Sequence, residues 1–292
     1  MFIDYPTIPA QLEVLLDVLY VMRDKKTDYE ALKKIIQPKG LPGLTDSSSQ
    51  IKNHLKAASE LDLIELDEAK NYCLKYKKNG RNYNAKVEVL KAFDQKVLSN
   101  TILDAWTARV YSYLILREVD VGPTGSSEQE LFAKDFMASL ATSIDKKDPM
   151  NNVKYTGVIR WYCYSGLGWL DPSGAFVPDP TLRLKRVMSN IWQKDLKLDV
   201  ETFMSRLART CPELDGGLIF QEVSKGSYNA LGKTCTRALA TALWRLHDEN
   251  EIRLVCPNDT TGWHLSLAGT GRVRGEASNR VLHVEKMERA DV

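Results

Sequence analysis

One arrangement occurs three times along the chain: a helix, a short break and a β-hairpin. The first copy, SSSQIKNHLKAASELDLIELDEAKNYCLKYKK, covers residues 47–78. Ile51, Leu55 and Ala58 recur at helical spacing and predict an amphipathic helix. LIEL then has the composition of a strand, DEAKN is typical of a turn, and YCLKY predicts the returning strand.

The second copy is RWYCYSGLGWLDPSGAFVPDPT, residues 160–181, the densest group of aromatics and glycines in the sequence. Gly166 and Gly168 are expected to end the helix, because glycine tolerates positive φ. DPSG has the chemistry of a tight turn. GLGW lacks the third glycine and the preceding strand of a dinucleotide-binding fingerprint. The core between helix and hairpin is expected to contain Trp161, Tyr162 and Trp169.

The third copy is TCTRALATALWRLHDENEIRLVCPNDTTGWHLSL. Its helix is predicted over roughly residues 234–248, and IRLVC and WHLSL are predicted to pair as a hairpin. Helical patterns precede each copy, at residues 11–23 and 28–36, 99–118 and 128–144, and 200–209 and 218–223.

Helix, break and hairpin form the second half of a winged helix, and threefold repetition strengthens that prediction. We therefore expect a mainly α protein with short β-hairpins, built from tandem winged-helix domains. The predicted parts are an N-terminal winged helix (1–95), a helical middle domain ending in a winged-helix-like hairpin (96–185), a C-terminal winged helix (186–268) and a tail (269–292). The tail is expected to be flexible or partner-bound.

Composition limits the kind of partner. Among 292 residues, Lys and Arg number 40 against 38 Asp and Glu, so nucleic-acid binding requires a local basic patch. No apolar run predicts a transmembrane helix, and the N-terminus does not resemble a signal peptide. The five cysteines are odd in number and form no CxxC pair, which favours free thiols in the cytoplasm.

The first copy carries the best candidate nucleic-acid interface. Its polar helix face offers Lys52, Asn53 and Lys56, and the predicted wing offers Lys75, Lys77, Lys78 and Arg81. A basic wing beside a polar helix suits duplex DNA, because lysines attract phosphates and the helix sets the register. A merely solvated hairpin is the alternative, since charged runs usually face water.

GSYNALGKT, residues 226–234, precedes a predicted helix as a phosphate-binding loop would. It has five residues between Gly226 and Gly232, whereas the Walker A motif has four. A nucleotide-dependent enzyme built on this motif is therefore disfavoured. Instead, Lys233, Thr234 and Arg237 are possible phosphate contacts at the start of the last recognition helix.

No catalytic or metal-binding pattern emerges, and we expect neither an enzyme nor a cofactor. The four histidines show neither an i, i+4 pair nor HExxH. His54 is expected to be solvated or to contact phosphate. Glu213 and Asp215, before two glycines, are expected to be turn residues.

The stretch RWYCYSGLGW…FVPDPTLRLKR, followed by LDGG at residues 214–217, resembles DpdG-type proteins. These are accessory proteins of bacterial gene clusters that install and police deazapurine bases in DNA. The resemblance spans the middle and C-terminal thirds. It implies a phage-defence setting, in which a non-catalytic subunit works beside a helicase, nuclease or ATPase. It carries over no catalytic residue.

Two functional hypotheses follow. In the first, the chain is a non-catalytic subunit that contacts duplex DNA through its N-terminal winged helix and docks onto a larger complex through its other domains. In the second, it is a winged-helix scaffold that binds only protein and bridges ATPase or nuclease subunits. The broad apolar face of TRALATALWRLH favours protein docking for the last copy in either case.

Overall fold

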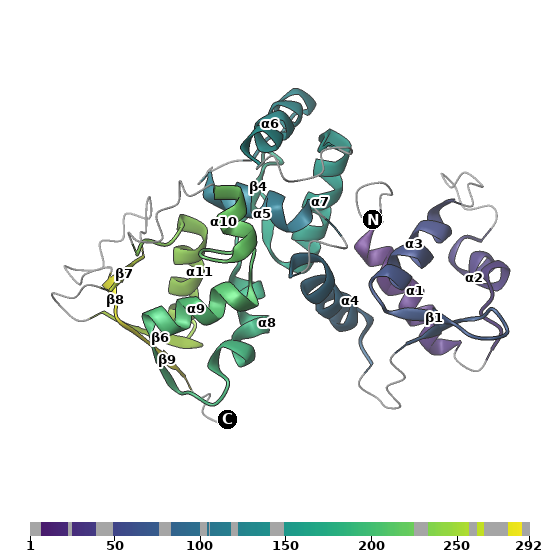
Figure 1. The fold of residues 1–292 in the computed structure, drawn as a ribbon. Helices are drawn as coiled ribbons and strands as arrows, with labels where there is room; N and C mark the ends of the chain where they lie inside the picture. The colour runs from purple at the N-terminus through teal and green to yellow at the C-terminus, as the bar shows by residue number, and fades with distance from the viewer. Residues whose placement is uncertain are drawn as a thin grey trace. The chain divides into compact units, whose positions relative to one another are not determined.

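The computed structural model describes residues 7–22, 25–38, 49–75, 83–99, 104, 106–117, 122–140, 149–224, 233–256, 262–265 and 280–287. In these ranges the chain is mainly helical with small antiparallel strand pairs, as predicted (Figure 1). The chain divides into two compact units. Unit 1 comprises residues 1–105 and 153–164, and unit 2 comprises residues 106–152 and 165–292. No helix in the described ranges is both long enough and apolar enough to cross a membrane.

The helices of unit 1 are α1 (Pro9–Val21), α2 (Tyr29–Ile36), α3 (Ser49–Glu60), α4 (Ala85–Phe93) with the π-helical turn η1 (Asp94–Leu98), and most of α7 (Asn152–Ser165). Two of them, α2 and α4, begin at capping side chains. Asp28 caps α2 by accepting a hydrogen bond from the Ala31 N–H at 2.9 Å. Asn84 caps α4 in the same way, accepting from the Val87 N–H at 3.1 Å.

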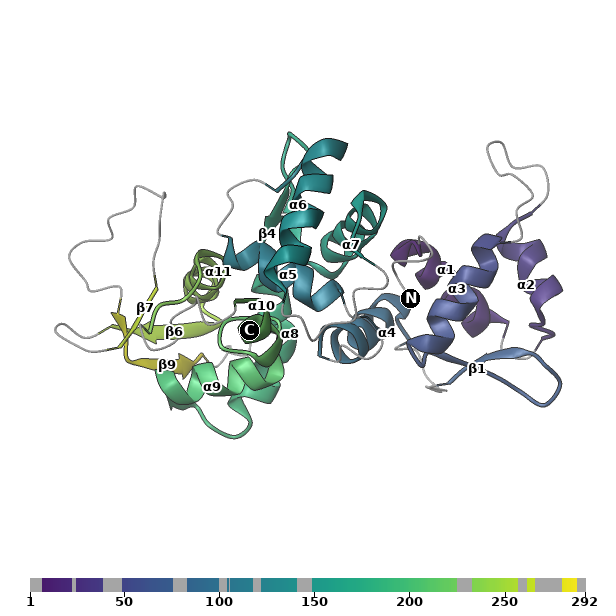
Figure 2. The same cartoon turned by 45° about the horizontal axis from the view of Figure 1, so that its top comes forward.

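The core of unit 1 forms around α1 and α3, which pack against each other (Figure 2). Ile51, Leu55 and Ala58, the residues that predicted α3, are all buried. A second part of the core lies between α4 and α7, where Phe93 stacks on Trp161 with ring centroids 5.0 Å apart. Stacked and interdigitated rings of this kind fix the helices against each other.

The first hairpin has the predicted position. β1 (Ile64–Leu66) and β2 (Tyr72–Leu74) pair antiparallel around the turn DEAKN. The outer edge of β2 meets the segment before α2. The Tyr72 N–H donates to the Thr27 carbonyl at 3.1 Å, and the Thr27 hydroxyl donates to the Tyr72 carbonyl at 2.8 Å. Across this small sheet the order is therefore Thr27, β2, β1.

The second hairpin, β3 (Gly168–Leu170) and β4 (Phe176–Pro178), also lies where the sequence predicts it. Gly166 ends α7 with φ +68°, as expected for a glycine terminator. Gly168 does not adopt positive φ, so the predicted reason for this glycine is wrong. It sits in β3, where a Cβ would lie 2.2 Å from the Val177 carbonyl oxygen, and the close strand approach is what requires glycine.

The DPSG turn is held by its aspartate. Asp171 Oδ1 accepts hydrogen bonds from the Ser173 N–H at 2.8 Å and from the Ala175 N–H at 3.0 Å. Gly174 has φ +86°, a conformation that most side chains disfavour. The predicted tight turn is confirmed.

The aromatic residues of this region divide between core and surface. Trp161 and Tyr162 are buried, as predicted. Trp169 is 45% exposed, so its assignment to the core was wrong. It pairs across the hairpin with Val177, whereas the neighbouring residue of that strand, Phe176, faces the core. Because adjacent strand residues point to opposite faces, Trp169 is left on the outer one.

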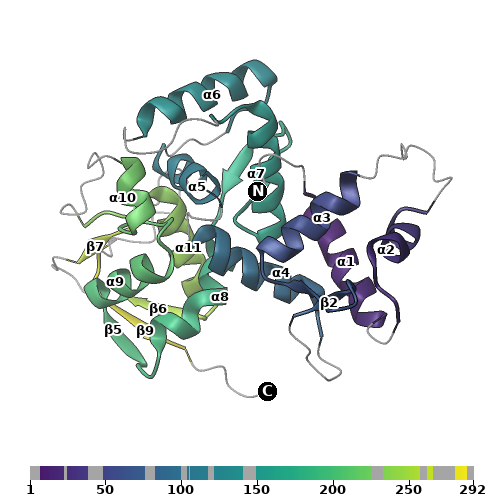
Figure 3. The same cartoon turned by 45° about the vertical axis from the view of Figure 1, so that its right-hand side comes forward.

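Unit 2 combines helices with a three-stranded sheet. Its helices are α5 (Thr107–Leu116), α6 (Ser126–Ser139), α8 (Thr181–Trp192), α9 (Val200–Thr210), α10 (Leu218–Ser224) and α11 (Arg237–Asp248). Its strands β5 (Lys197–Asp199), β9 (His283–Lys286) and β6 (Ile252–Val255) pair antiparallel in the order β5-β9-β6. α9 packs against β5 and β9 (Figure 3).

The predicted hairpin between IRLVC and WHLSL is wrong. β6 pairs with β9, while β7 (Trp263–His264) pairs with β8 (Arg280–Val281). The physical reason is burial: Val284 of β9 lies opposite both Leu198 and Leu254, and all three are buried. The predicted tail, residues 269–292, therefore contains the central strand of the sheet.

The turn between α9 and α10 ties three helices together. Glu213 and Asp215 lie in this turn as predicted, but both are buried. Arg183 of α8 donates from Nε to Glu213 Oε1 at 2.9 Å, and the Ser112 hydroxyl of α5 donates to the Glu213 carbonyl at 2.8 Å. Asp215 accepts from the N–H of Thr236, the residue before α11, at 2.6 Å and from its hydroxyl at 2.8 Å.

The two glycines of LDGG are required by this geometry. Gly216 has φ +78°. A Cβ on Gly217 would lie 2.4 Å from the Pro212 carbonyl oxygen, a backbone atom that cannot move aside cheaply. The motif is therefore structural: Asp215 anchors the start of α11, and the glycines allow the chain to turn sharply beneath it.

We expect the substitution Arg183→Leu to lower the free energy of unfolding by about 3–5 kcal/mol, because it leaves the buried Glu213 carboxylate without its partner. Adding Glu213→Leu should recover much of that loss, since the carboxylate that lost its arginine is then also removed. Urea denaturation measures both. Lys197→Met, which breaks the exposed Lys197–Glu285 pair, is the control and should cost less than about 1 kcal/mol. Equal losses in Arg183→Leu and the double variant would contradict the argument.

Candidate nucleic-acid interface

The outer face of α3 carries the predicted cations. Lys52 and Lys56 are exposed and Asn53 is half-buried, whereas the stripe containing Ile51 and Leu55 faces the core. The spacing of 3.6 residues per turn separates the two faces. The three α3 residues predicted to contact DNA are thus brought together on one helix, with both ammonium groups at the surface.

Each of these two lysines lies near a side chain of its own unit. Lys52 Nζ lies 5.9 Å from the ring centroid of Tyr29, at the start of α2. Lys56 Nζ lies 3.9 Å from Glu60 Oε1, one turn along α3, with more than half of the lysine side chain exposed. Exposed contacts of this kind are individually weak. Tyr29, a neighbour that sequence reasoning missed, positions Lys52.

The predicted wing is less favourable to an anion. Lys75 forms an ion pair and hydrogen bond with Asp62, and Lys96 lies 3.7 Å from the other oxygen of the same carboxylate. The hydrogen bond from Lys75 is the main cause that lowers the pKa of the Asp62 carboxyl. Lys75 is thus engaged by an acid of its own unit. The remaining predicted wing residues, Lys77, Lys78 and Arg81, lie outside the described residues.

The turn of the first hairpin is acidic. Glu65, Asp67 and Glu68 are all exposed there, against the exposed Lys70. Asp67 is committed to the turn, accepting from the Asn71 N–H at 2.7 Å and from its side-chain amide at 3.2 Å. Carboxylates at this tip repel phosphates. In the described part of unit 1, the surface best suited to a polyanion is therefore α3 and not the β1–β2 turn.

His54 is buried, so the prediction that it is solvated or contacts phosphate is wrong. It lies three residues after Ile51 and four before Ala58, on the buried stripe of α3. Its Nδ1 lies 2.6 Å from the Gln50 carbonyl, which identifies Nδ1 as the protonated ring nitrogen. Burial lowers its pKa, because desolvation disfavours the charged ring more than the Gln50 carbonyl favours it.

The second candidate site lies before α11. The helix begins at Arg237, three residues later than predicted, because Thr236 is its N-cap. Lys233, which has φ +50°, and Thr234 precede the helix, and Thr234 forms an isolated parallel bridge with His264. Lys233 Nζ lies 2.7 Å from Glu201 Oε1, and this hydrogen bond is the main cause that lowers the Glu201 pKa. Arg237 is half-buried on the first turn of α11.

The predicted phosphate contacts before α11 therefore differ from those on α3. Lys233 already has a carboxylate partner, and Gly226–Gly232, the rest of the loop motif, lies outside the described residues. The strands of unit 2 that the structure describes pair antiparallel, whereas a phosphate-binding loop joins a strand of a parallel sheet to a helix.

Other cations of unit 2 are also paired with acids. Four such pairs are Arg245–Asp179, Lys185–Glu249, Arg206–Asp195 and Arg109–Glu222. The Arg109–Glu222 pair is bidentate, with Nε and Nη2 donating at 2.9–3.1 Å. Within the described ranges, no three His, Cys, Asp or Glu side chains come together as a possible metal site. These pairs join helices of unit 2 to one another or to the segments beside them, and a phosphate that bound one of these cations would compete with its carboxylate.

The chain is mainly helical, with two exposed lysines on α3 in unit 1 and several ion pairs in unit 2. Comparison with known proteins identifies the family to which such a chain belongs. The model of the DpdG-like family matches residues 3–260. The chain therefore belongs to the DpdG-like family, which confirms the resemblance drawn from RWYCYSGLGW and LDGG. Membership implies a role in a gene cluster for DNA modification and defence. Neither the curated proteins nor the solved structures contain a match to the chain.

We expect acid to destabilise unit 1 through His54. Because burial holds its pKa below 6.5, the unfolded chain takes up a proton below that pH before the folded chain does. The contribution of His54 to stability is thus complete above pH 6.5 and decreases as the pH falls from there towards the lowered pKa, with a slope of up to ~1.4 kcal/mol per pH unit. His54→Leu should lose this dependence.

Urea denaturation at about pH 7.5 and about pH 5.5, on either side of the ordinary histidine pKa, measures the effect. NMR of the ring protons, assigned with the same variant, reports the His54 pKa directly. A ring that titrates at or above 6.5 in the folded protein would contradict the prediction.

Proposed function

We propose that the chain is built from tandem winged helices, one in each unit. The winged-helix order is helix, strand, helix, helix, strand, strand, with the first strand beside the last. Unit 1 follows it as α1, Thr27, α2, α3, β1 and β2. Unit 2 follows it as α8, β5, α9, α11, β6 and β9, with α10 inserted before α11 and with β7 and β8 inserted between β6 and β9. In each unit the last strand lies between the other two: β2 lies between Thr27 and β1, and β9 lies between β5 and β6. This shared order is the observation that supports the proposal.

In this proposal the N-terminal winged helix occupies residues 1–95, as the sequence indicates, and α3 is its recognition helix. Lys52 and Lys56 would contact phosphates, and Asn53 would face the groove of duplex DNA. The support is the exposure of Lys52 and Lys56 on the same face of α3, beside Asn53. Lys77, Lys78 and Arg81 are proposed as additional phosphate contacts on sequence grounds alone.

Unit 2 is proposed to dock onto other subunits of a defence complex, with no catalytic role. Lys233 and Arg245 are paired with carboxylates of the same unit, and membership of the DpdG-like family supports the setting. The broad apolar face of α11 is buried against its own unit, so docking would use other surfaces. All five cysteines are free, which supports the cytoplasm as the compartment.

We expect the double charge reversal Lys52→Glu/Lys56→Glu to weaken duplex DNA binding about equally for every sequence. The slope of log affinity against log salt concentration should become shallower by roughly two, because two phosphate contacts are lost. Gel shifts over a range of salt concentrations measure both. Lys25→Glu/Lys91→Glu is the matched control, with two exposed lysines of the same unit outside α3. Undiminished affinity in the α3 variant, with normal affinity in the control, would refute the site.

The alternative is a scaffold that binds only protein. Pairing of Lys75 with Asp62 and the acidic β1–β2 turn favour it, because both reduce the attraction of unit 1 for phosphates. Two measurements on the unaltered protein separate the alternatives: a gel shift with duplex DNA and co-purification with proteins encoded beside it. Co-purification without any shift, even at low salt, would leave only the scaffold.

A further inference from the structure

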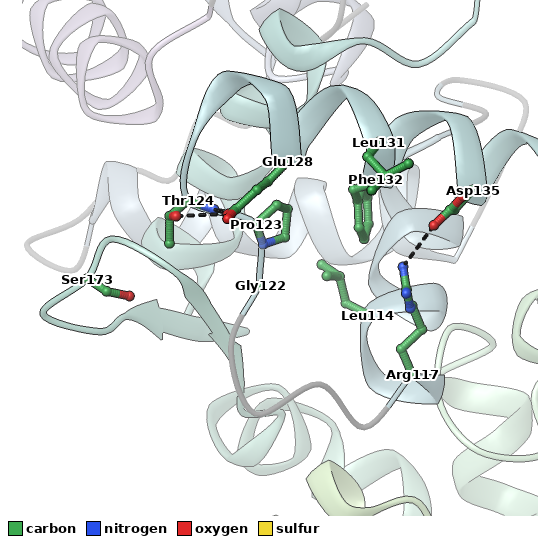
Figure 4. A pocket seen from close by; sticks show the side chains of 10 residues that line it. All are labelled: Leu114, Arg117, Gly122, Pro123, Thr124, Glu128, Leu131, Phe132, Asp135 and Ser173. Carbon is green, nitrogen blue, oxygen red and sulfur yellow. Dashed lines mark hydrogen bonds and ion pairs between the residues drawn. The ribbon is translucent and has the colours of Figure 1, made fainter.

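A cavity of about 540 Å³ opens on unit 2, beside α5 and α6 (Figure 4). Its volume lies within the range of ~300–1,000 Å³ typical of ligand sites. Leu114 and Phe132 are buried residues on its wall, and Pro123 and Leu131 add apolar surface. The turn of the β3–β4 hairpin contributes Ser173.

An aromatic cluster supports the apolar part of the cavity. Phe132 is stacked with Phe136 at a centroid distance of 6.4 Å, and Tyr113 meets both rings edge-on at 5.4 Å. Aromatic clusters of this kind hold their rings in fixed orientations. The hollow is thus a preformed receptor for an apolar side chain, and filling it would not require the helices to move.

Two polar pairs lie on the cavity wall, Thr124 with Glu128 and Arg117 with Asp135, and only the first is joined by short hydrogen bonds (Figure 4). Glu128 Oε2 accepts from the Thr124 N–H at 2.8 Å and the Thr124 hydroxyl at 2.9 Å, and these bonds lower its pKa. Arg117 Nη1 lies 3.8 Å from Asp135 Oδ2, beyond hydrogen-bond distance, and both side chains are partly exposed. Arg117 also lies over the Tyr113 ring, with Cζ 5.4 Å from the ring centroid. Because a guanidinium has more N–H donors than these contacts use, Arg117 and Asp135 retain hydrogen-bonding capacity towards a ligand.

The charge of the wall selects the ligand. One arginine against two carboxylates gives a formal net charge of −1, which disfavours phosphates and nucleic acids. A group that donates to Asp135 and also accepts from Arg117 fits the polar end, and a peptide unit, with one N–H and one C=O, has both functions. An apolar side chain next to that peptide unit suits the hollow.

We propose that this cavity is the docking site for a peptide segment of a partner protein. The segment is extended, carries an apolar side chain and has no net negative charge. The peptide backbone bridges Arg117 and Asp135, and one apolar side chain enters the hollow lined by Leu114 and Phe132. This inference rests on the proposed docking role of unit 2 and names the surface that performs it.

The test uses the full-length protein and overlapping synthetic peptides that cover the proteins encoded beside it. A peptide that binds is labelled, and its affinity is measured by fluorescence anisotropy. Leu131→Glu places a carboxylate on the rim at a residue that is 60% exposed, so folding should be preserved while affinity falls by about tenfold or more. Leu218→Glu, at a leucine of α10 that is 79% exposed and outside the cavity, is the matched control.

Loss of peptide binding in Leu131→Glu but not in Leu218→Glu supports the site, as does weaker binding in Arg117→Gln and Asp135→Asn. Full affinity of the peptide for the Leu131→Glu variant overturns the proposal. The proposal is also overturned if a single-stranded oligonucleotide displaces the peptide and Leu131→Glu abolishes binding of that oligonucleotide. If partner subunits co-purify but no peptide binds, this inference fails while the docking function stands. If neither occurs, both fail.

Discussion

The buried ion pair between Arg183 and Glu213 is the constraint on which the arrangement of unit 2 depends. It fixes the turn after α9 to α8, and the same turn is joined to α5 through Ser112 and to the start of α11 through Asp215. A charge pair excluded from water is worth little unless its geometry and its further hydrogen bonds are complete. Here one short turn therefore determines how three helices meet, and its glycines are fixed by backbone approach and positive φ.

Electrostatics separates the two units more clearly than their helices and strands do. Lys233, Arg245 and Lys185 of unit 2 each form an ion pair with a carboxylate of the same unit. On α3, Lys52 lies near the ring of Tyr29 and Lys56 lies 3.9 Å from Glu60. An anion that binds at Lys233 competes with the Glu201 carboxylate, whereas one that binds at Lys52 meets an aromatic ring that carries no charge.

Local patterns allowed much of the fold to be predicted. The stripe of Ile51, Leu55 and Ala58, the DEAKN turn and the DPSG turn each depend on neighbouring residues, and all three are confirmed. The predicted pairing of IRLVC with WHLSL failed because strand pairing is decided by burial across the sheet. Val284 fits between Leu198 and Leu254, although it follows a polar, glycine-rich stretch that reads as a tail.

The candidate site was predictable only in part, for a related reason. Helical periodicity separates the exposed Lys52 and Lys56 from the core, but it places His54 on the buried stripe, where residue type alone suggested a polar face. Ion pairs between distant residues, such as Lys75 with Asp62, have no sequence signal of their own.

The cavity on unit 2 illustrates the same limit. Its apolar wall comes from α5 and α6, its loosely paired charges from the ends of those helices, and its remaining edge from the β3–β4 hairpin turn. The DPSG motif predicts the hairpin turn but not its place beside α5 and α6, and only folding brings Arg117 near Asp135. Phe132 and Phe136 stack in the core beneath the cavity, whereas rim residues such as Leu131 are exposed and contribute little to stability. Substitutions at the rim can therefore change the surface of the cavity without altering the core. Partner choice can therefore change at the rim while the fold of unit 2 is retained.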